Sequence, residues 1–244
     1  MQQIFKVGGC VRDELLGLSS KDIDFTFVVD DLNISVDEGF LLMHNWLTER
    51  GFKIFLSTPD CFTIRARFPQ DDPNAGLVAD FVMARKEIGY EEGTRRPILQ
   101  LGTLEDDLTR RDFTVNALAV DADGNLIDIF DGIWAIENRI LITPLDPEIT
   151  FMDDPLRMIR ALRFSITKGF TIAPIVWNAM FIPGLIDKLE KVVSPERIRE
   201  EVLKMFEVDT AASLRLFADI DRIEPRFTDL IFGRTMWLKP TFEK

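Results

Sequence analysis

Two short stretches decide the fold: residues 6–13, which read KVGGCVRD, and residues 21–28, which read KDIDFTFV. They predict a strand, a glycine turn, a short helix and a second strand that carries two acids. Side chains alternate along a strand, so Asp22 and Asp24 share one face while the apolar residues point to the other. Neighbouring carboxylates repel unless a cation lies between them, and oxygen ligands favour Mg²⁺. The glycines leave backbone amides open to a phosphate. The two stretches together predict metal-dependent chemistry on a nucleotide.

Length and composition limit the possible classes. The chain has 244 residues and is 46% apolar, enough for one large domain or two ordinary ones with a sizeable core. No apolar run is long enough to span a membrane and the N-terminus lacks a signal pattern, so we expect a cytoplasmic protein with no membrane partner. Two cysteines and a single histidine, His44, disfavour a disulfide scaffold, a zinc cluster and a Ser-His-Asp triad.

The overall charge bears on nucleic-acid binding. The formal net charge is −12, from 41 acidic and 29 basic residues. Contacts to phosphates require Lys and Arg, so this balance argues against an extensive RNA footprint. A local basic face on an acidic protein stays possible.

The first part of the chain alternates short apolar segments with turn residues, which is typical of strands. An amphipathic helix is expected at residues 37–49, and Thr103 followed by Asp106 indicates the start of a helix that carries Arg111. Residues 85–101 are mostly polar, and we expect a long loop there. The expected strands are residues 4–7, 23–29, 53–57, 61–68, 77–84, 117–120 and 126–129.

The pattern changes after about residue 145, where apolar residues recur at helical spacing. We therefore predict an α+β fold: a head at residues 1–145 with a mixed or antiparallel sheet, an all-α neck at residues 146–207, and a short helical remnant at residues 208–244. The expected helices are residues 155–166, 173–180, 185–192 and 195–206.

A third acid is expected beside the first two. Metal-dependent nucleotidyl transfer needs two or three carboxylates around the metal site. Asp80 lies inside an otherwise apolar strand, at residues 78–82, and is the candidate. The alternative reading is an exposed acid on an edge strand.

Five segments resemble, in family order, the motifs of class II tRNA nucleotidyltransferases (CCA-adding enzymes) and bacterial poly(A) polymerases. These enzymes belong to the beta-type polymerase superfamily, which implies the fold of the head. The matching segments are residues 8–24, 110–117, 128–132, 153–164 and 194–201.

The resemblance implies roles for the head residues. Asp22 and Asp24 would be catalytic and would ligate the metal, Mg²⁺, and Asp80 would be the third catalytic carboxylate. The residues that would hold the triphosphate and ribose of the nucleotide are Gly8, Gly9, Arg12, Arg111, Asp112 and Asn116. A solvated helix face is the alternative reading for the arginines at 110 and 111.

The fourth motif would select the base. Asp154 and Arg157 are three residues apart and share a face if both lie on a helix. A carboxylate accepts from an exocyclic amine and an arginine donates to a ring nitrogen, so the pair can accept cytosine and adenine and reject uracil and guanine. Arg160 and Arg163 continue the stripe and would contact phosphate or brace the pair. The alternative reading of Asp154 and Arg157 is a simple helical salt bridge.

The sequence thus predicts a nucleotidyltransferase that adds C and A from CTP and ATP to the 3′ end of tRNA and releases pyrophosphate. The resemblance also implies that the 85–101 loop repositions the template between C and A addition; a plain surface loop is the alternative. Other functions stay open: a poly(A) polymerase, a partial CC- or A-adding enzyme, a nucleotidylating enzyme for proteins or small molecules, or a non-catalytic RNA- or nucleotide-binding module.

Overall fold

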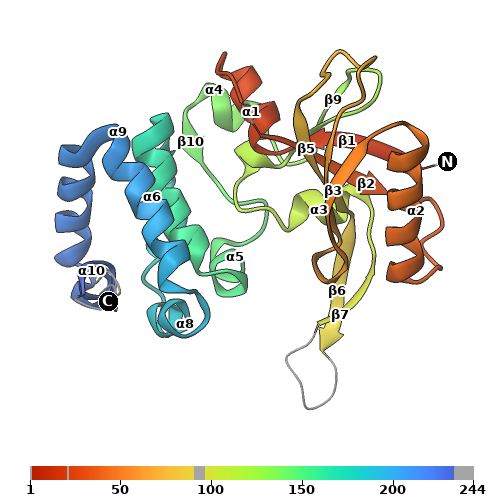
Figure 1. The fold of residues 1–244 in the computed structure, drawn as a ribbon. Coiled ribbons are helices and arrows are strands. Elements are labelled where there is room, and N and C mark those ends of the chain that lie inside the picture. Colours follow the sequence, from red (N-terminus) through yellow and green to blue (C-terminus); the bar gives the residue numbers. More distant parts are fainter. Residues whose placement is uncertain (1, 21, 91–96, 234–244) are drawn as a thin grey trace, which may run out of the picture. The chain divides into compact units, whose positions relative to one another are not determined.

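The computed structural model of the chain describes residues 2–20, 22–90 and 97–233. The fold divides into two compact units, Met1–Glu137 and Asn138–Lys244, and each is described by itself. The division falls slightly before the boundary predicted at residue 145. Strands dominate the first unit and helices the second (Figure 1), so the predicted α+β class is confirmed.

A seven-stranded mixed sheet forms the centre of the first unit. Its strand order is β3-β4-β5-β2-β1-β8-β9, and among these strands only the β2–β5 pair is parallel. The hairpin predicted at residues 117–129 is present as β8 and β9. The strands are β1 (Gln3–Val7), β2 (Ile23–Val28), β3 (Lys53–Thr58), β4 (Thr63–Arg67), β5 (Val78–Met83), β8 (Leu118–Val120) and β9 (Leu126–Asp128).

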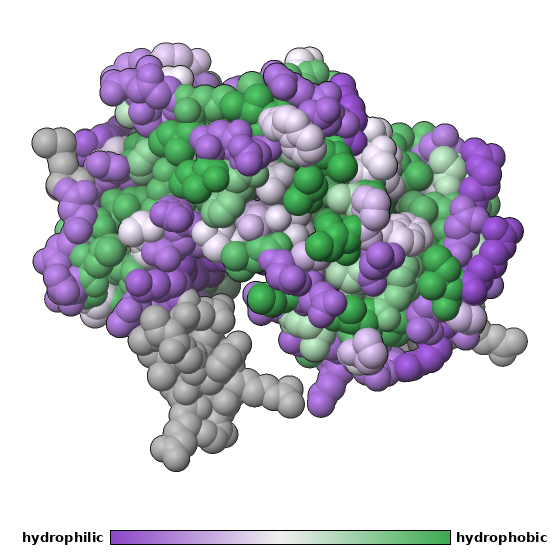
Figure 2. Space-filling model, turned by 180° about the vertical axis from the view of Figure 1, so that it is seen from behind, coloured by the Kyte–Doolittle hydropathy of each residue, from purple (hydrophilic) through white to green (hydrophobic). Residues whose placement is uncertain are grey.

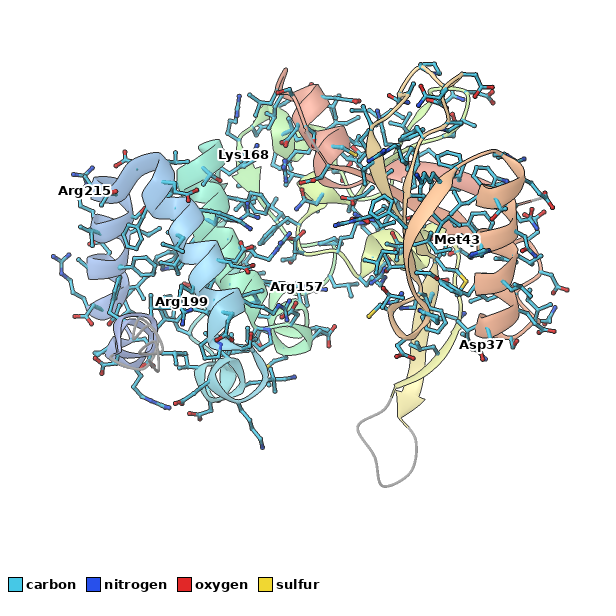
Figure 3. The ribbon with its side chains drawn as sticks, viewed as in Figure 1. Asp37, Met43, Arg157, Lys168, Arg199 and Arg215 are labelled. Carbon is cyan, nitrogen blue, oxygen red and sulfur yellow. The ribbon has the colours of Figure 1, made fainter. Side chains whose placement is uncertain are left out.

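A different helix packs on each face of this sheet. On one face, helix α2 (Val36–Glu49) packs Met43 and Leu47 against Phe27 and Phe81 (Figures 1 and 3). On the other face, helix α3 (Leu104–Thr109) packs Leu108 against β1 and β8. Strand side chains alternate between the faces, so the acids of β2 and β5 lie on the α3 face.

The helices of the first unit begin at the predicted signals. Ser35 and Glu38 form a capping box at α2, and Thr103 and Asp106 form another at α3. Helix α3 ends at Thr109, however, so the prediction that it carries Arg111 is wrong. The remaining elements are α1 (Gly9–Leu15), α4 (Gly132–Glu137) and the short 3₁₀ turns η1 (Pro59–Cys61) and η2 (Thr114–Asn116).

Residues 85–101 differ from the predicted long loop. Strands β6 (Arg85–Tyr90) and β7 (Pro97–Leu101) pair antiparallel as a separate two-stranded ribbon. The residues between them, 91–96, lie outside the described part of the chain. Polar composition alone suggested a loop, but strand pairing is made by backbone N–H and C=O groups and does not require apolar side chains.

The second unit is helical, as predicted, apart from one short strand pair. Helices α6 and α9 pack together at its centre, and α9 is kinked at Asp209, where the backbone leaves helical geometry. Helix α9 runs through the boundary predicted at residue 207. The elements are β10 (Ile140–Leu141), α5 (Pro147–Asp153), α6 (Leu156–Lys168), β11 (Thr171–Ile172), α7 (Pro174–Ala179), α8 (Leu185–Val192), α9 (Pro195–Asp221) and α10 (Pro225–Phe232).

The surface mixes polar and apolar residues. Figure 2 shows hydrophilic and hydrophobic residues side by side over the visible face, and Phe55, Leu56 and Leu41 are among the exposed apolar side chains of the first unit. Among the described helices, none combines the length and the apolar character needed to cross a membrane.

Candidate nucleotidyl-transfer site

Three charged residues form a row across neighbouring strands on the α3 face of the sheet. Asp24 of β2 lies opposite Asp80 of β5, and Asp80 lies opposite Arg65 of β4. The guanidinium of Arg65 donates from Nε and Nη2 to the two carboxylate oxygens of Asp80, at 2.6 and 2.5 Å. Strand β5 is internal to the sheet, so the edge-strand reading of Asp80 is wrong.

The predicted separation of side chains on β2 is confirmed by the packing. Ile23, Phe25 and Phe27 pack into the core beneath α2, which places Asp24 on the opposite face. Asp22 precedes the strand and is exposed. The three predicted carboxylates therefore come from two parallel neighbouring strands and the residue that leads into one of them.

The electrostatics of Asp24 indicate where a cation would bind. Burial raises the pKa of Asp24, and the negative charges of Asp80 and Asp22 raise it further, although Arg111 and Arg65 act in the opposite sense. The described part of the chain contains no preformed cluster of three His, Cys, Asp or Glu side chains that could hold a metal; both oxygens of Asp80 already accept from Arg65. The donor set consists of carboxylate oxygens whose repulsion a cation would relieve, and it fits a divalent ion such as Mg²⁺.

The glycine turn lies directly against Arg111. Gly8 has a φ of 78°, and a Cβ atom there would approach Arg111 Nη1 to 2.6 Å. The backbone conformation therefore favours glycine, and a side chain at this position would also displace the end of the Arg111 side chain. The Gly8 amide donates to the carbonyl of Leu118 at 3.2 Å, so the prediction that this amide is open to a phosphate is wrong. At Gly9 the nearest side-chain group is the guanidinium of Arg12.

A buried polar network joins three other predicted residues. Arg12 donates to Asn116 Oδ1, and Asn116 Nδ2 donates to Asp112 Oδ1 at 2.8 Å. Arg12 also forms an ion pair with Asp13 at 2.7 Å. All four side chains are buried. The structure therefore brings Arg12, Asp112 and Asn116 together, although they come from α1 and from the segment around η2.

Asp107 organises the arginines and was missed by the sequence analysis. It is fully buried and accepts hydrogen bonds from Thr26, Arg110 and Arg111. Burial raises the pKa of Asp107, but the two arginines and the Thr26 hydroxyl outweigh this effect and lower it to about 2. The arginines lie three and four residues after the acid, just beyond the C-terminal end of the short helix α3, and this spacing was the available signal.

Asp154 and Arg157 belong to the second unit, and their arrangement differs from the prediction. Asp154 lies in an extended conformation between α5 and α6, so the two residues do not share a helical face. One Asp154 oxygen accepts from the Leu156 amide at 3.1 Å, and the other lies 3.7 Å from Arg197 Nη2. Arg157, labelled in Figure 3, lies on α6 and donates to the carbonyl of Thr150 at 3.3 Å. Pro155 interrupts the helix and explains the difference.

Arg160 and Arg163 contact a buried acid of α9. Arg163 Nε lies 2.5 Å from Glu201 Oε2, an ion-pair contact without hydrogen-bond geometry, and Arg160 Nη1 lies 3.9 Å from Glu201 Oε1. Arg163 also lies over the ring of Phe164, 4.2 Å from its centroid. Both arginines therefore join α6 to α9. Their predicted roles, contact to a phosphate or bracing of Asp154 and Arg157, stay predictions.

Residues 4–142 match the model of the poly(A) polymerase head domain family. The chain belongs to this family. The match covers the whole charged row, the glycine turn and the Asp107 cluster of the first unit. It stops before Asp154 and Arg157.

Similar proteins carry consistent names. The chain is 35% identical over 206 residues to the tRNA nucleotidyltransferase cca2 of Schizosaccharomyces pombe, covering 81% of this chain and 42% of the relative. It is 33% identical over 205 residues to a CCA-adding enzyme of Limosilactobacillus fermentum, covering 83% of this chain and 46% of that enzyme. The fold resembles that of the Bacillus stearothermophilus CCA-adding enzyme in complex with CTP, with a TM-score of 0.70 and 29% identity. The match covers 89% of this chain and 48% of that enzyme. The chain thus spans less than half the length of each of these proteins.

Proposed function

We propose that this chain is an RNA nucleotidyltransferase that adds C and A from CTP and ATP to the 3′ end of tRNA. The observation that carries the proposal is the placement of Asp24 and Asp80 side by side on one sheet face, within the electrostatic reach of Arg111 beside the glycine turn. The family membership and the names of the relatives support the same chemistry.

In the proposed reaction, the 3′ hydroxyl of the RNA attacks the α-phosphate of the nucleotide in line. A new P–O bond forms, the bond to the β-phosphate breaks, and pyrophosphate leaves. Asp22 and Asp24 would hold Mg²⁺, with Asp80 as the third carboxylate; the ion would lower the pKa of the hydroxyl and stabilise charge on the leaving group.

The triphosphate would lie over the turn at Gly8 and Gly9. Arg111 suits this role because its guanidinium lies at the turn, and its buried Nε has no hydrogen-bond partner among the residues that the structure describes. A phosphate oxygen would satisfy such a donor. Arg12 would also contact the triphosphate. Its guanidinium would then interact with the triphosphate as well as with Asp13 and Asn116.

Asp112 and Asn116 would bind the ribose. Their side chains are joined by a hydrogen bond of 2.8 Å and are buried, so they hold a fixed orientation before a nucleotide arrives. A preorganised polar pair binds a hydroxyl at a smaller entropic cost than two mobile side chains would.

The base would be chosen by Asp154 and Arg157. The carboxylate would accept from the amine of cytosine or adenine, and the guanidinium would donate to the adjacent ring nitrogen. Uracil and guanine present the reversed pattern and would leave polar groups unpaired. Arg160 and Arg163, braced by Glu201, would keep α6 in place.

The test incubates the full chain with Mg²⁺, one labelled nucleoside triphosphate at a time, and tRNA ending before C, CC or CCA. Ordered addition of C, C and A to tRNA supports the proposal. Long A tails on any RNA would instead identify a poly(A) polymerase, and nucleotide binding without product would identify a binding module.

Two variants of the first unit each remove one negative charge, so they differ only in the position of the lost carboxylate. Asp24→Asn should abolish transfer, whereas Asp60→Asn, at an exposed turn of the same unit, should leave it unchanged. Equal activity of the two variants would refute the assignment of the metal site.

A further inference from the structure

Arg65 places a permanent positive charge in the row of acids. The β4–β5 register puts Arg65 opposite Asp80, and the β5–β2 register puts Asp80 opposite Asp24. Neighbouring strands lie about 4.8 Å apart, so the row spans about 10 Å. Ile64 and Ala66, the neighbours of Arg65 on β4, are buried in the core beneath α2, which fixes Arg65 on the face that carries the acids.

The contact between Arg65 and Asp80 has the geometry of a strong ion pair. Two parallel N–H donors of the guanidinium meet the two oxygens of one carboxylate, at 2.6 and 2.5 Å. The side chains are 47% and 25% exposed, so the pair is partly screened by solvent. The charge of Arg65 also acts on Asp22 and Asp24.

We propose that Arg65 is the resident counter-cation of this acid row and competes with the divalent metal for Asp80. A metal ion that binds at Asp22 and Asp24 can use Asp80 only by displacing Arg65 or by sharing its carboxylate. The affinity of the free protein for divalent ions is therefore lower than three carboxylates alone would provide. The inference rests on the proposed function in one respect: the proposed function identifies a divalent metal ion as the ligand of these acids.

The sheet offers a matched control for this proposal. Arg67 lies two residues further along β4, on the same face, is also exposed, and pairs in register with Val78 rather than with an acid. Arg65→Gln and Arg67→Gln therefore remove the same charge from the same strand. Only the first variant frees the oxygens of Asp80.

The experiment titrates the full chain with Mn²⁺ in the absence of nucleotide and RNA, and measures free Mn²⁺ by electron paramagnetic resonance. Arg65→Gln should tighten Mn²⁺ binding about fivefold, the effect of losing a partly exposed competing charge. Arg67→Gln should change it less than about twofold, since only long-range repulsion is removed. Unchanged circular dichroism spectra verify that both variants are folded.

A double-mutant cycle ties the effect to Asp80. Asp80→Asn should weaken Mn²⁺ binding much more in the Arg65→Gln background than in the wild type, where Asp80 is already engaged. Equal effects of the two arginine variants, weaker binding by Arg65→Gln, or no measurable binding by any of the proteins would each overturn the proposal.

The titration contains no substrate, so its outcome is independent of the reaction. Tighter Mn²⁺ binding by Arg65→Gln would stand even if the chain transferred no nucleotide. If the chain transferred nucleotides but Arg65→Gln left Mn²⁺ binding unchanged, the proposed competition between Arg65 and the metal would be refuted and the proposed function would be unaffected.

Discussion

Replacing Asp107 by asparagine should destabilise the first unit by about 2–3 kcal/mol at pH 7. The carboxylate is fully buried and accepts from Thr26 and from two arginines, Arg110 and Arg111. Asparagine has nearly the same shape, but it removes the negative charge and points an N–H₂ group at arginine donors. Arg110 is half exposed and can regain water, whereas Arg111 is largely covered.

The magnitude follows from the pKa of Asp107, which falls from an ordinary value of 3.8 to about 2 in the folded protein. Each unit of such a shift corresponds to about 1.4 kcal/mol, so the charged form contributes about 2 kcal/mol. Because the folded pKa is lowered, this contribution is fully present above pH 4 and is lost as the pH falls toward 2. The stability difference between wild type and Asp107→Asn should shrink over that range.

The assay is urea unfolding of both proteins at pH 7 and pH 3, followed by tryptophan fluorescence and far-UV circular dichroism. Trp46 reports on the first unit because it packs against Phe27 in the core. Glu105→Gln, an exposed charge removal on the same helix, serves as the control and should change stability by less than about 0.5 kcal/mol. A stability difference for Asp107→Asn that is below this level, or equal at the two pH values, would refute the reasoning.

Three further substitutions test other parts of the site. Gly8→Ala should weaken CTP binding at least about tenfold, because it adds about 1 kcal/mol of backbone strain and displaces Arg111. The control is Gly17→Ala, which also lies at positive φ but has open space around it, so it should lower stability by about 1 kcal/mol and leave CTP binding unchanged. Isothermal titration measures the change in CTP binding, and unfolding curves measure the change in stability. Asp154→Ala should raise incorporation of UTP and GTP relative to CTP and ATP about tenfold or more in single-nucleotide assays, and unchanged ratios would remove it from base selection. Glu201→Gln should destabilise the second unit by about 2–4 kcal/mol in thermal unfolding, since it removes the buried carboxylate that Arg160 and Arg163 contact from α6. A shift in melting temperature below about 2 °C would contradict this.

The acid-bearing strand was predictable because its pattern has a period of two. Ile23, Phe25 and Phe27 could be buried together only if Asp24 pointed the other way. The capping boxes at α2 and α3 were predictable for a similar reason, since the helix start and its cap are neighbours in sequence. Patterns that refer to local geometry alone identified most of the elements.

The partners of the acids were not predictable in this way. Arg65 meets Asp80 through the pairing of β4 and β5, and Thr26 meets Asp107 across 81 residues of sequence. Nothing in either local pattern specifies the register or the packing that creates these contacts. The arrangement of Asp154 was misread for a different reason, because the proline at 155 breaks the helix that the spacing had implied.

The acids of the first unit differ in how their charge is balanced, and this difference supports the proposed metal site at Asp24. Asp80 is paired with Arg65, and Asp107 is paired with Arg110 and Arg111. Within the described residues, the half-buried side chain of Asp24 forms no ion pair, and its pKa is raised by burial and by the neighbouring acids. A cation added beside Asp24 would relieve the repulsion from Asp80 and Asp22 and would favour the charged form of this carboxylate. We therefore place the proposed metal at Asp24, the acid of this row that forms no ion pair within the described residues.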